Sequence, residues 1–113
     1  MARSKTDLTL KEELRARIKT DLLDQLERNG TVGEYYTDLV DDYMDLWDTK
    51  TELVKDIREH GVKVEYTSNN GITNMKKNES VDLRIKVNAQ MLKLLSELGV
   101  KPSQADPGDL DEL

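Results

Sequence analysis

The amino-acid sequence predicts a mainly α-helical protein with three helices, one of them long, and a small β-hairpin between the second and the third. Apolar residues recur at helical spacing in three long stretches. Between the second and third stretches, apolar and polar residues alternate around an Asn-Gly dipeptide, which is typical of a hairpin. The last stretch is apolar on more than one face, and a chain of 113 residues has few other elements to cover both. Self-assembly is therefore the first functional expectation.

The first helix is predicted to begin at a capping box, Thr9-Leu10-Lys11-Glu12, and to end at Asn29-Gly30. Its apolar stripe recurs every four residues and consists of Leu10, Leu14, Ile18, Leu22 and Leu26. Residues 1–8 before it are polar and are expected to form a flexible basic arm.

The second helix is predicted over about residues 32–59, with a capping box at Thr31-Val32-Gly33-Glu34 and a stop at Gly61. Its apolar seam alternates spacings of four and three and comprises Tyr36, Val40, Tyr43, Trp47, Lys50, Val54 and Ile57. A flanking row at sevens adds Leu39, Leu46 and Leu53. This spacing resembles a coiled coil with one lysine in the seam, and the opposite face is acidic.

The hairpin is predicted at residues 62–77, with Asn70-Gly71 in a two-residue type I′ turn. That turn would pair Tyr66 with Met75 and Glu65 with Lys76. A two-stranded hairpin is marginal alone, so it must lean on the helices or on a neighbouring subunit.

The third helix is predicted over residues 79–98, with Asn78 or Ser80 as its cap, Gly99 at its end and Pro102 blocking continuation. One apolar stripe contains Val81, Ile85, Leu92 and Leu95, and a second contains Leu83, Val87, Met91, Leu94 and Leu98. Residues 9–103 thus form a helical oligomerisation core. Residues 104–113 form an acidic tail that is expected to be disordered in isolation.

Composition excludes several classes of site. The chain has no cysteine and one histidine, which excludes disulfides, thiolate metal sites and histidine clusters. His60 lies at a helix end without a nucleophile motif nearby, and a surface or capping role is expected for it. The acids form a distributed face rather than a loop of metal ligands, and no Walker-type loop is present. We therefore expect no active site, no metal and no cofactor.

Charge is uneven along the chain, whose net charge is −6. Residues 1–19 and 61–101 each carry a net charge of +3, whereas residues 20–60 carry −8. Phosphate contact is local, so a basic segment can bind DNA on an acidic protein. The candidate DNA-binding residues are Arg3, Lys5, Arg15, Arg17, Lys19, Lys76, Lys77 and Arg84. The cations of the first helix have an alternative role, which is to pair with the acidic face of the second.

The candidate oligomerisation residues come from the seam and from the second stripe of the last helix. They are Tyr36, Tyr43, Leu46, Trp47, Val54, Leu83, Val87 and Met91. Aromatic residues at helical spacing indicate a core or a subunit contact far more often than a ligand surface.

Three short motifs in order resemble the small terminase subunit of tailed phages over about residues 22–104. The long acidic helix ends in Arg58-Glu59-His60-Gly61, Lys77-Asn78 opens the last helix, and Leu98-Gly99-Val100-Lys101-Pro102-Ser103 closes it. The resemblance is to the branch with a Lys-Asn-Pro helix start and a Leu-Gly-apolar-Thr-Pro-Ser end. Three residues depart from that pattern: Glu79 replaces the proline, Lys101 the threonine, and Gln104 a common arginine.

The resemblance implies a homo-oligomeric ring that binds double-stranded viral DNA, initiates genome packaging and regulates the ATPase and nuclease of the large terminase subunit. It implies no catalytic centre in the chain itself. Leu110 and Leu113 of the acidic tail are candidate contacts to the large subunit. No apolar run approaches the ~18 residues of a membrane span, so we expect no membrane partner and a location in the host cytoplasm. The alternative is a non-catalytic helical scaffold or adaptor that oligomerises without binding nucleic acid.

Overall fold

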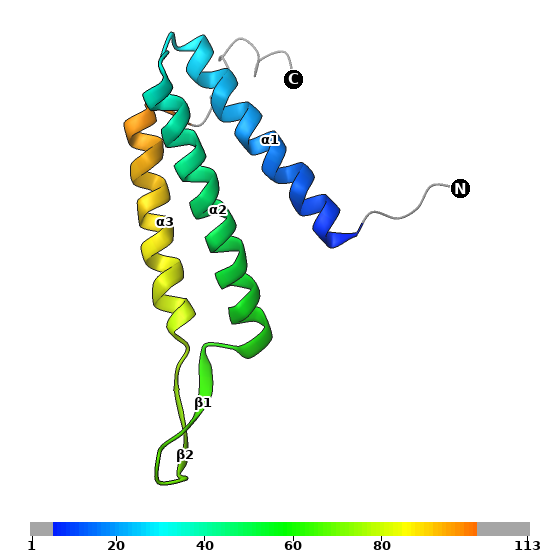
Figure 1. Ribbon diagram of the computed structural model, residues 1–113, viewed down its shortest axis with the longest axis vertical. Helices are drawn as coiled ribbons and strands as arrows, with labels where there is room; N and C mark the ends of the chain where they lie inside the picture. Colours follow the sequence, from blue (N-terminus) through cyan, green and yellow to red (C-terminus); the bar gives the residue numbers. More distant parts are fainter. Residues whose placement is uncertain (1–5, 102–113) are drawn as a thin grey trace, which may run out of the picture.

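The computed structural model describes residues 6–101 and confirms the predicted fold class (Figure 1). The helices are α1 (Asp7–Arg28), α2 (Glu34–His60) and α3 (Glu79–Leu98). The antiparallel strands β1 (Lys63–Thr67) and β2 (Thr73–Lys77) lie between α2 and α3. As predicted, the second helix is the longest of the three, with 27 residues.

The helices α2 and α3 run antiparallel and side by side, and the hairpin extends beyond their joined ends (Figure 1). Helix α1 approaches α2 near the α1–α2 turn, and its N-terminal half diverges from α2 (Figure 1). The Cα radius of gyration is 19.6 Å, whereas a compact domain of this length would have about 13 Å. This open arrangement leaves apolar surface uncovered.

The core forms where all three helices meet. Its buried side chains are Leu22, Leu26, Val40, Met44 and Leu98. Met44 is 1 % exposed, yet it does not belong to the predicted seam of α2. Because α2 is covered by both α1 and α3, its buried arc is wider than a coiled-coil seam.

Helix α1 begins earlier than predicted. The Oγ1 atom of Thr6 accepts a hydrogen bond from the backbone N–H of Thr9 at 3.1 Å, and the helix starts at Asp7. The predicted capping box at Thr9 is therefore wrong, since Thr6 offers the same hydroxyl one turn earlier. Residues 6–8 accordingly belong to α1 and its cap rather than to the arm predicted for residues 1–8.

Helix α2 begins later than predicted, at Glu34. Its N-cap is Gly33, with φ of +125°, and no side chain caps the helix start. The capping box predicted at Thr31 does not form, because Thr31 lies two residues before the N-cap. At Gly33 the backbone takes a conformation that L-residues rarely adopt.

The predicted register of the hairpin is wrong by one residue. The structure pairs Glu65 with Met75 and Tyr66 with Asn74. Gly71 donates its N–H to the carbonyl of Ser68 at 2.9 Å, and Ser68 donates to the carbonyl of Ile72 at 2.8 Å. A type I′ turn needs positive φ at both central residues, and among residues 6–101 positive φ occurs only at glycines. Gly71, with φ of +79°, instead closes a three-residue loop.

Candidate nucleic-acid interface

The hairpin carries three exposed lysines near its junction with the helices. Lys63 lies directly opposite Lys77, and Lys76 has its Nζ atom 5.2 Å from the centre of the Tyr66 ring. Lys77 Nζ also lies 2.7 Å from Asp82 Oδ2 in the first turn of α3. Like charges facing each other across a strand pair are unfavourable, so this end of the molecule favours an anionic neighbour.

The cations of α1 are used differently. Arg15 donates from Nε to Asp48 Oδ1 at 2.8 Å and from a terminal nitrogen to Asp48 Oδ2 at 3.0 Å. The hydrogen bond to Asp48 raises the pKa of Arg15 above its ordinary value. Lys19 Nζ lies 3.2 Å from Asp41 Oδ1. Arg15 and Lys19 thus take the alternative role that the sequence suggested, which is to pair with the acidic face of the second helix.

The remaining DNA candidates are Arg17, Arg84, Arg3 and Lys5. Arg17 and Arg84 are exposed on α1 and α3. Arg3 and Lys5 lie outside residues 6–101, the part of the chain that the structure describes, as do Leu110 and Leu113 of the tail. The described DNA candidates therefore come from three places: the hairpin, α1 and, for Arg84, α3.

A hydrogen-bonded junction fixes the hairpin to the helices. The side chain of Asn78, only 6 % exposed, donates from Nδ2 to Asp56 Oδ2 at 3.0 Å and to the carbonyl of Gly61 at 2.9 Å. Its Oδ1 accepts from the N–H of Ser80 at 3.0 Å, which caps α3. Its own N–H donates to the carbonyl of Val62 at 2.8 Å. One residue thus joins the end of α2, the base of the hairpin and the start of α3.

Asp56 is the acceptor at the centre of this junction. Ser80 donates its hydroxyl to Asp56 Oδ2 at 2.7 Å, and His60 Nδ1 lies 3.0 Å from Oδ1. The hydrogen bonds from Ser80 and Asn78 hold the pKa of Asp56 below its ordinary value. The motifs Arg58–Gly61 and Lys77-Asn78, far apart in the sequence, therefore meet in one structural feature.

The motif that ends α3 also has a structural role. Gly99 adopts φ of +68°, and the N–H of Val100 donates to the carbonyl of Leu95 at 3.0 Å. Val100 packs against the core, and Gln25 Nε2 donates to the carbonyl of Lys101 at 2.9 Å. The helix cap thereby ties the end of α3 to α1.

The candidate oligomerisation residues fall into two groups. Tyr36, Tyr43 and Trp47 pack against the core of their own chain, where burial raises the pKa of Tyr43. Met91 is buried as well. The other four are at least partly exposed: Leu46, Val54, Leu83 and Val87.

Sequence reasoning passed over several exposed apolar residues. Ile85 and Leu92 are 65 % and 60 % exposed and lie seven residues apart on one face of α3. The signal was present, since both belong to the first predicted stripe. Sequence periodicity could not show that Met91 and Leu98 of the second stripe are buried while Ile85 and Leu92 of the first stay exposed.

The structure also bears on the expectations about metals, membranes and His60. Residues 6–101 contain no group of three or more histidine, cysteine or acidic side chains that could hold a metal ion. No helix within that range is long and apolar enough to cross a membrane. His60 is exposed at the end of α2.

Comparison with known proteins points in one direction. The family profile described as phage terminase, small subunit, matches residues 16–106. No curated protein and no solved structure matches the chain. The match includes all of α2, the hairpin and α3, with the junction at Asn78 and the helix end at Gly99. The chain belongs to the phage terminase small subunit family.

Proposed function

We propose that this chain binds viral double-stranded DNA, initiates genome packaging and regulates the ATPase and nuclease of the large terminase subunit. The family match over residues 16–106 carries this proposal, because it gives the chain a role in phage DNA packaging. Small subunits of this family are generally non-catalytic and regulatory. The chain would then act through two partners, DNA and the large subunit, in the host cytoplasm.

DNA contact is best supported at the hairpin. Lys63 and Lys76 are exposed there, at the end of the molecule farthest from the α1–α2 turn (Figure 1). Arg15 and Lys19 are committed to Asp48 and Asp41, so their charges contribute less to a phosphate. We place Lys63, Lys76 and Arg84 first among the DNA contacts. Lys77 comes after them, because it is paired with Asp82, and Arg17 with the arm residues is second.

Assembly makes so small a basic surface useful. Of the ten strand residues, only Val64 is partly covered, so the hairpin rests little on its own helices. Exposed Leu83, Ile85 and Leu92 leave α3 with apolar surface available to a second copy. A homo-oligomeric ring would cover that surface and repeat the hairpin lysines around it, so weak contacts per subunit add up to avidity.

The double substitution Lys63→Glu with Lys76→Glu is expected to weaken binding of phage DNA and to flatten its dependence on salt. Each lost phosphate contact reduces the slope of log affinity against log salt by about 1. Fluorescence anisotropy of labelled DNA across a salt series measures both quantities.

The matched control is Lys86→Glu with Lys93→Glu, which reverses two exposed charges on α3 away from the hairpin. Equal losses in both variants would mean that net charge alone governs binding. Unchanged affinity of the hairpin variant, with its oligomer intact, would remove the hairpin from the interface.

A non-catalytic scaffold that touches no nucleic acid is the second candidate. The pairing of Arg15 and Lys19 within the chain favours it, because those cations then serve packing rather than DNA. Absence of any salt-dependent DNA binding by the intact oligomer would select this candidate.

Contact with the large subunit is assigned to the acidic tail. Leu110 and Leu113 would act as apolar anchors, with the surrounding acids steering the encounter. Both leucines lie outside the described residues, so this assignment rests on their sequence alone.

A further inference from the structure

One groove of the molecule gathers positive charge on an otherwise acidic helix. The three lysine and arginine residues of α2, namely Lys50, Lys55 and Arg58, all line it, together with Lys11 of α1. Trp47 and Val54 supply its apolar lining, and Glu59 is its one acid. The groove has a volume of about 350 Å³. It therefore combines an apolar surface with four cations and a single carboxylate.

The hydrogen bond that Lys50 makes does not offset its positive charge. Its Nζ atom donates to Asn88 Oδ1 at 2.8 Å, in a partly buried position between α2 and α3. The acceptor is a neutral amide, which satisfies a donor without offsetting the charge. A partly buried ammonium of this kind favours a nearby anion.

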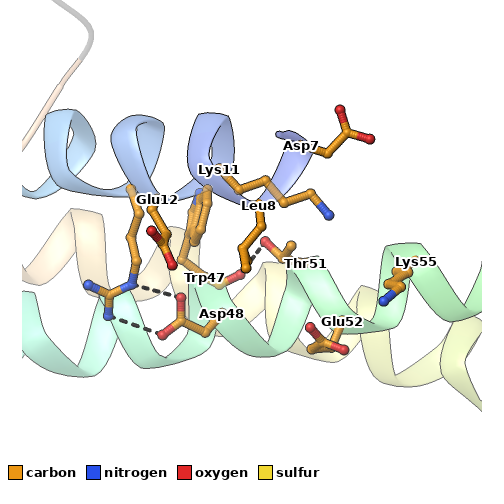
Figure 2. A pocket seen from close by; sticks show the side chains of 10 residues that line it. Asp7, Leu8, Lys11, Glu12, Trp47, Asp48, Thr51, Glu52 and Lys55 are labelled. Carbon is orange, nitrogen blue, oxygen red and sulfur yellow. Dashed lines mark hydrogen bonds and ion pairs between the residues drawn. The ribbon is translucent and has the colours of Figure 1, made fainter. Parts of the chain in front are cut away.

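The groove adjoins a second hollow, with which it shares Lys11 and Trp47. That hollow is lined by Asp7, Glu12 and Glu52 as well as by cations (Figure 2). In that view Leu8 and Trp47 lie between α1 and α2, while Asp48 is held by its two hydrogen bonds (Figure 2). The groove with Lys50 and Arg58 is the more basic of the two, so an anionic ligand would settle there rather than in the mixed hollow.

We propose that this groove binds the acidic tail of its own chain, residues 104–113. That segment carries four acids, Asp106, Asp109, Asp111 and Glu112, and no lysine or arginine. Leu110 and Leu113 are spaced three apart among those acids. The leucines would cover Trp47 and Val54, and the carboxylates would face Lys50, Lys55 and Arg58.

The length of the chain permits this contact. The described chain ends at Lys101, which lines a hollow with Tyr43 and α1 and is held by Gln25. From Tyr43 to Val54 the distance along α2 is about 17 Å, at ~1.5 Å per helical residue. Residues 102–109 can span up to about 26 Å when extended. Leu110 can therefore reach the groove without any change in the helices.

The apolar lining favours the tail over DNA. Phosphates would satisfy the cations but would leave the exposed parts of Trp47 and Val54 uncovered, whereas the leucines cover them. The docking does not depend on the proposed DNA role. It would make the tail unavailable to the large subunit, so docking and regulation would compete for the same two leucines.

Trp47 is the only tryptophan of the chain, so its fluorescence reports on this groove directly. In the full-length protein, Asp109→Lys with Asp111→Lys should shift its emission to the red and increase its quenching by acrylamide. Raising the salt concentration should move the unsubstituted protein toward the same values, because the contact is electrostatic. A peptide of residues 102–113, added to the substituted protein, should reverse both changes.

The matched control is Lys63→Glu with Lys76→Glu, which leaves the emission unchanged because the hairpin lies outside the groove.

A charge exchange completes the test. Lys55→Glu with Arg58→Glu should expose Trp47, and adding Asp109→Lys with Asp111→Lys should protect it again. Identical emission and quenching in the unsubstituted and tail-substituted proteins would overturn the proposal. So would a Trp47 response to duplex DNA that is equally strong with and without the tail substitutions, since that would make the groove a DNA site. Neither result would alter the hairpin's assignment, which the DNA titration tests separately.

Discussion

Replacing Asn78 with alanine is expected to lower the free energy of unfolding by about 2–4 kcal/mol. The substitution removes the cap of α3, which is worth about 1 kcal/mol, and leaves the partly buried acceptors at Asp56 and Gly61 short of a donor. Urea denaturation followed by circular dichroism measures the loss. The physical reason is position, because the side chain of Asn78 bonds both to the end of α2 and to the start of α3.

Asn74→Ala is the control, because Asn74 is exposed on β2 and should cost less than about 0.5 kcal/mol. Equal losses at the two positions would show that the junction contributes nothing particular. Asp56 supplies a second readout. Its folded-state pKa is held below the ordinary value of 3.8, so its stabilising contribution is present above that pH and is lost as the pH falls through the lowered pKa. This acid-dependent loss should be smaller in Asn78→Ala, where Ser80 and His60 remain as donors.

Replacing Leu98 with alanine is expected to cost about 2–5 kcal/mol. Leu98 is 2 % exposed in the cluster where the three helices meet, so its removal leaves a cavity that Leu22, Val40 and Met44 cannot easily fill. The free energy of unfolding again measures the effect.

Leu92→Ala is the matched variant, with the same chemistry on the same helix at 60 % exposure. Within one chain it should cost less than about 1 kcal/mol. A small loss at Leu98 would contradict the described core. A large loss at Leu92 that depends on protein concentration would show that a second copy covers this face of α3.

The sequence was sufficient for the three helices and for the end of α3, because apolar periodicity and Gly99 act locally. It left the cap of α3 open between Asn78 and Ser80, and the structure shows Asn78. It was insufficient where two candidates competed locally: Thr6 offered the same cap as Thr9, and the Asn-Gly dipeptide fitted both a two-residue and a three-residue loop. Met44 was missed because its burial depends on α1 lying against α2. The family motifs could be recognised in order, but that Asp56, Asn78 and Ser80 share one junction follows only from the fold.

The candidate site divides in the same way. Charge counting located both basic segments. It also raised the alternative that the cations of α1 pair with the acids of α2, and the structure shows such pairs between Arg15 and Asp48 and between Lys19 and Asp41. It ranked α1 and the arm above the hairpin, since charge counting could not show which cations are paired within the chain. The cation-lined groove also escaped notice, because Lys11 reaches it from a different helix.

The most direct test of the central claim is the mass of the particle in solution, measured by light scattering with and without phage DNA at low and high salt. We predict an oligomer larger than a tetramer that gains the mass of DNA at low salt and releases it at high salt. A monodisperse species of 12.9 kDa that gains no mass with DNA would contradict assembly and DNA binding together.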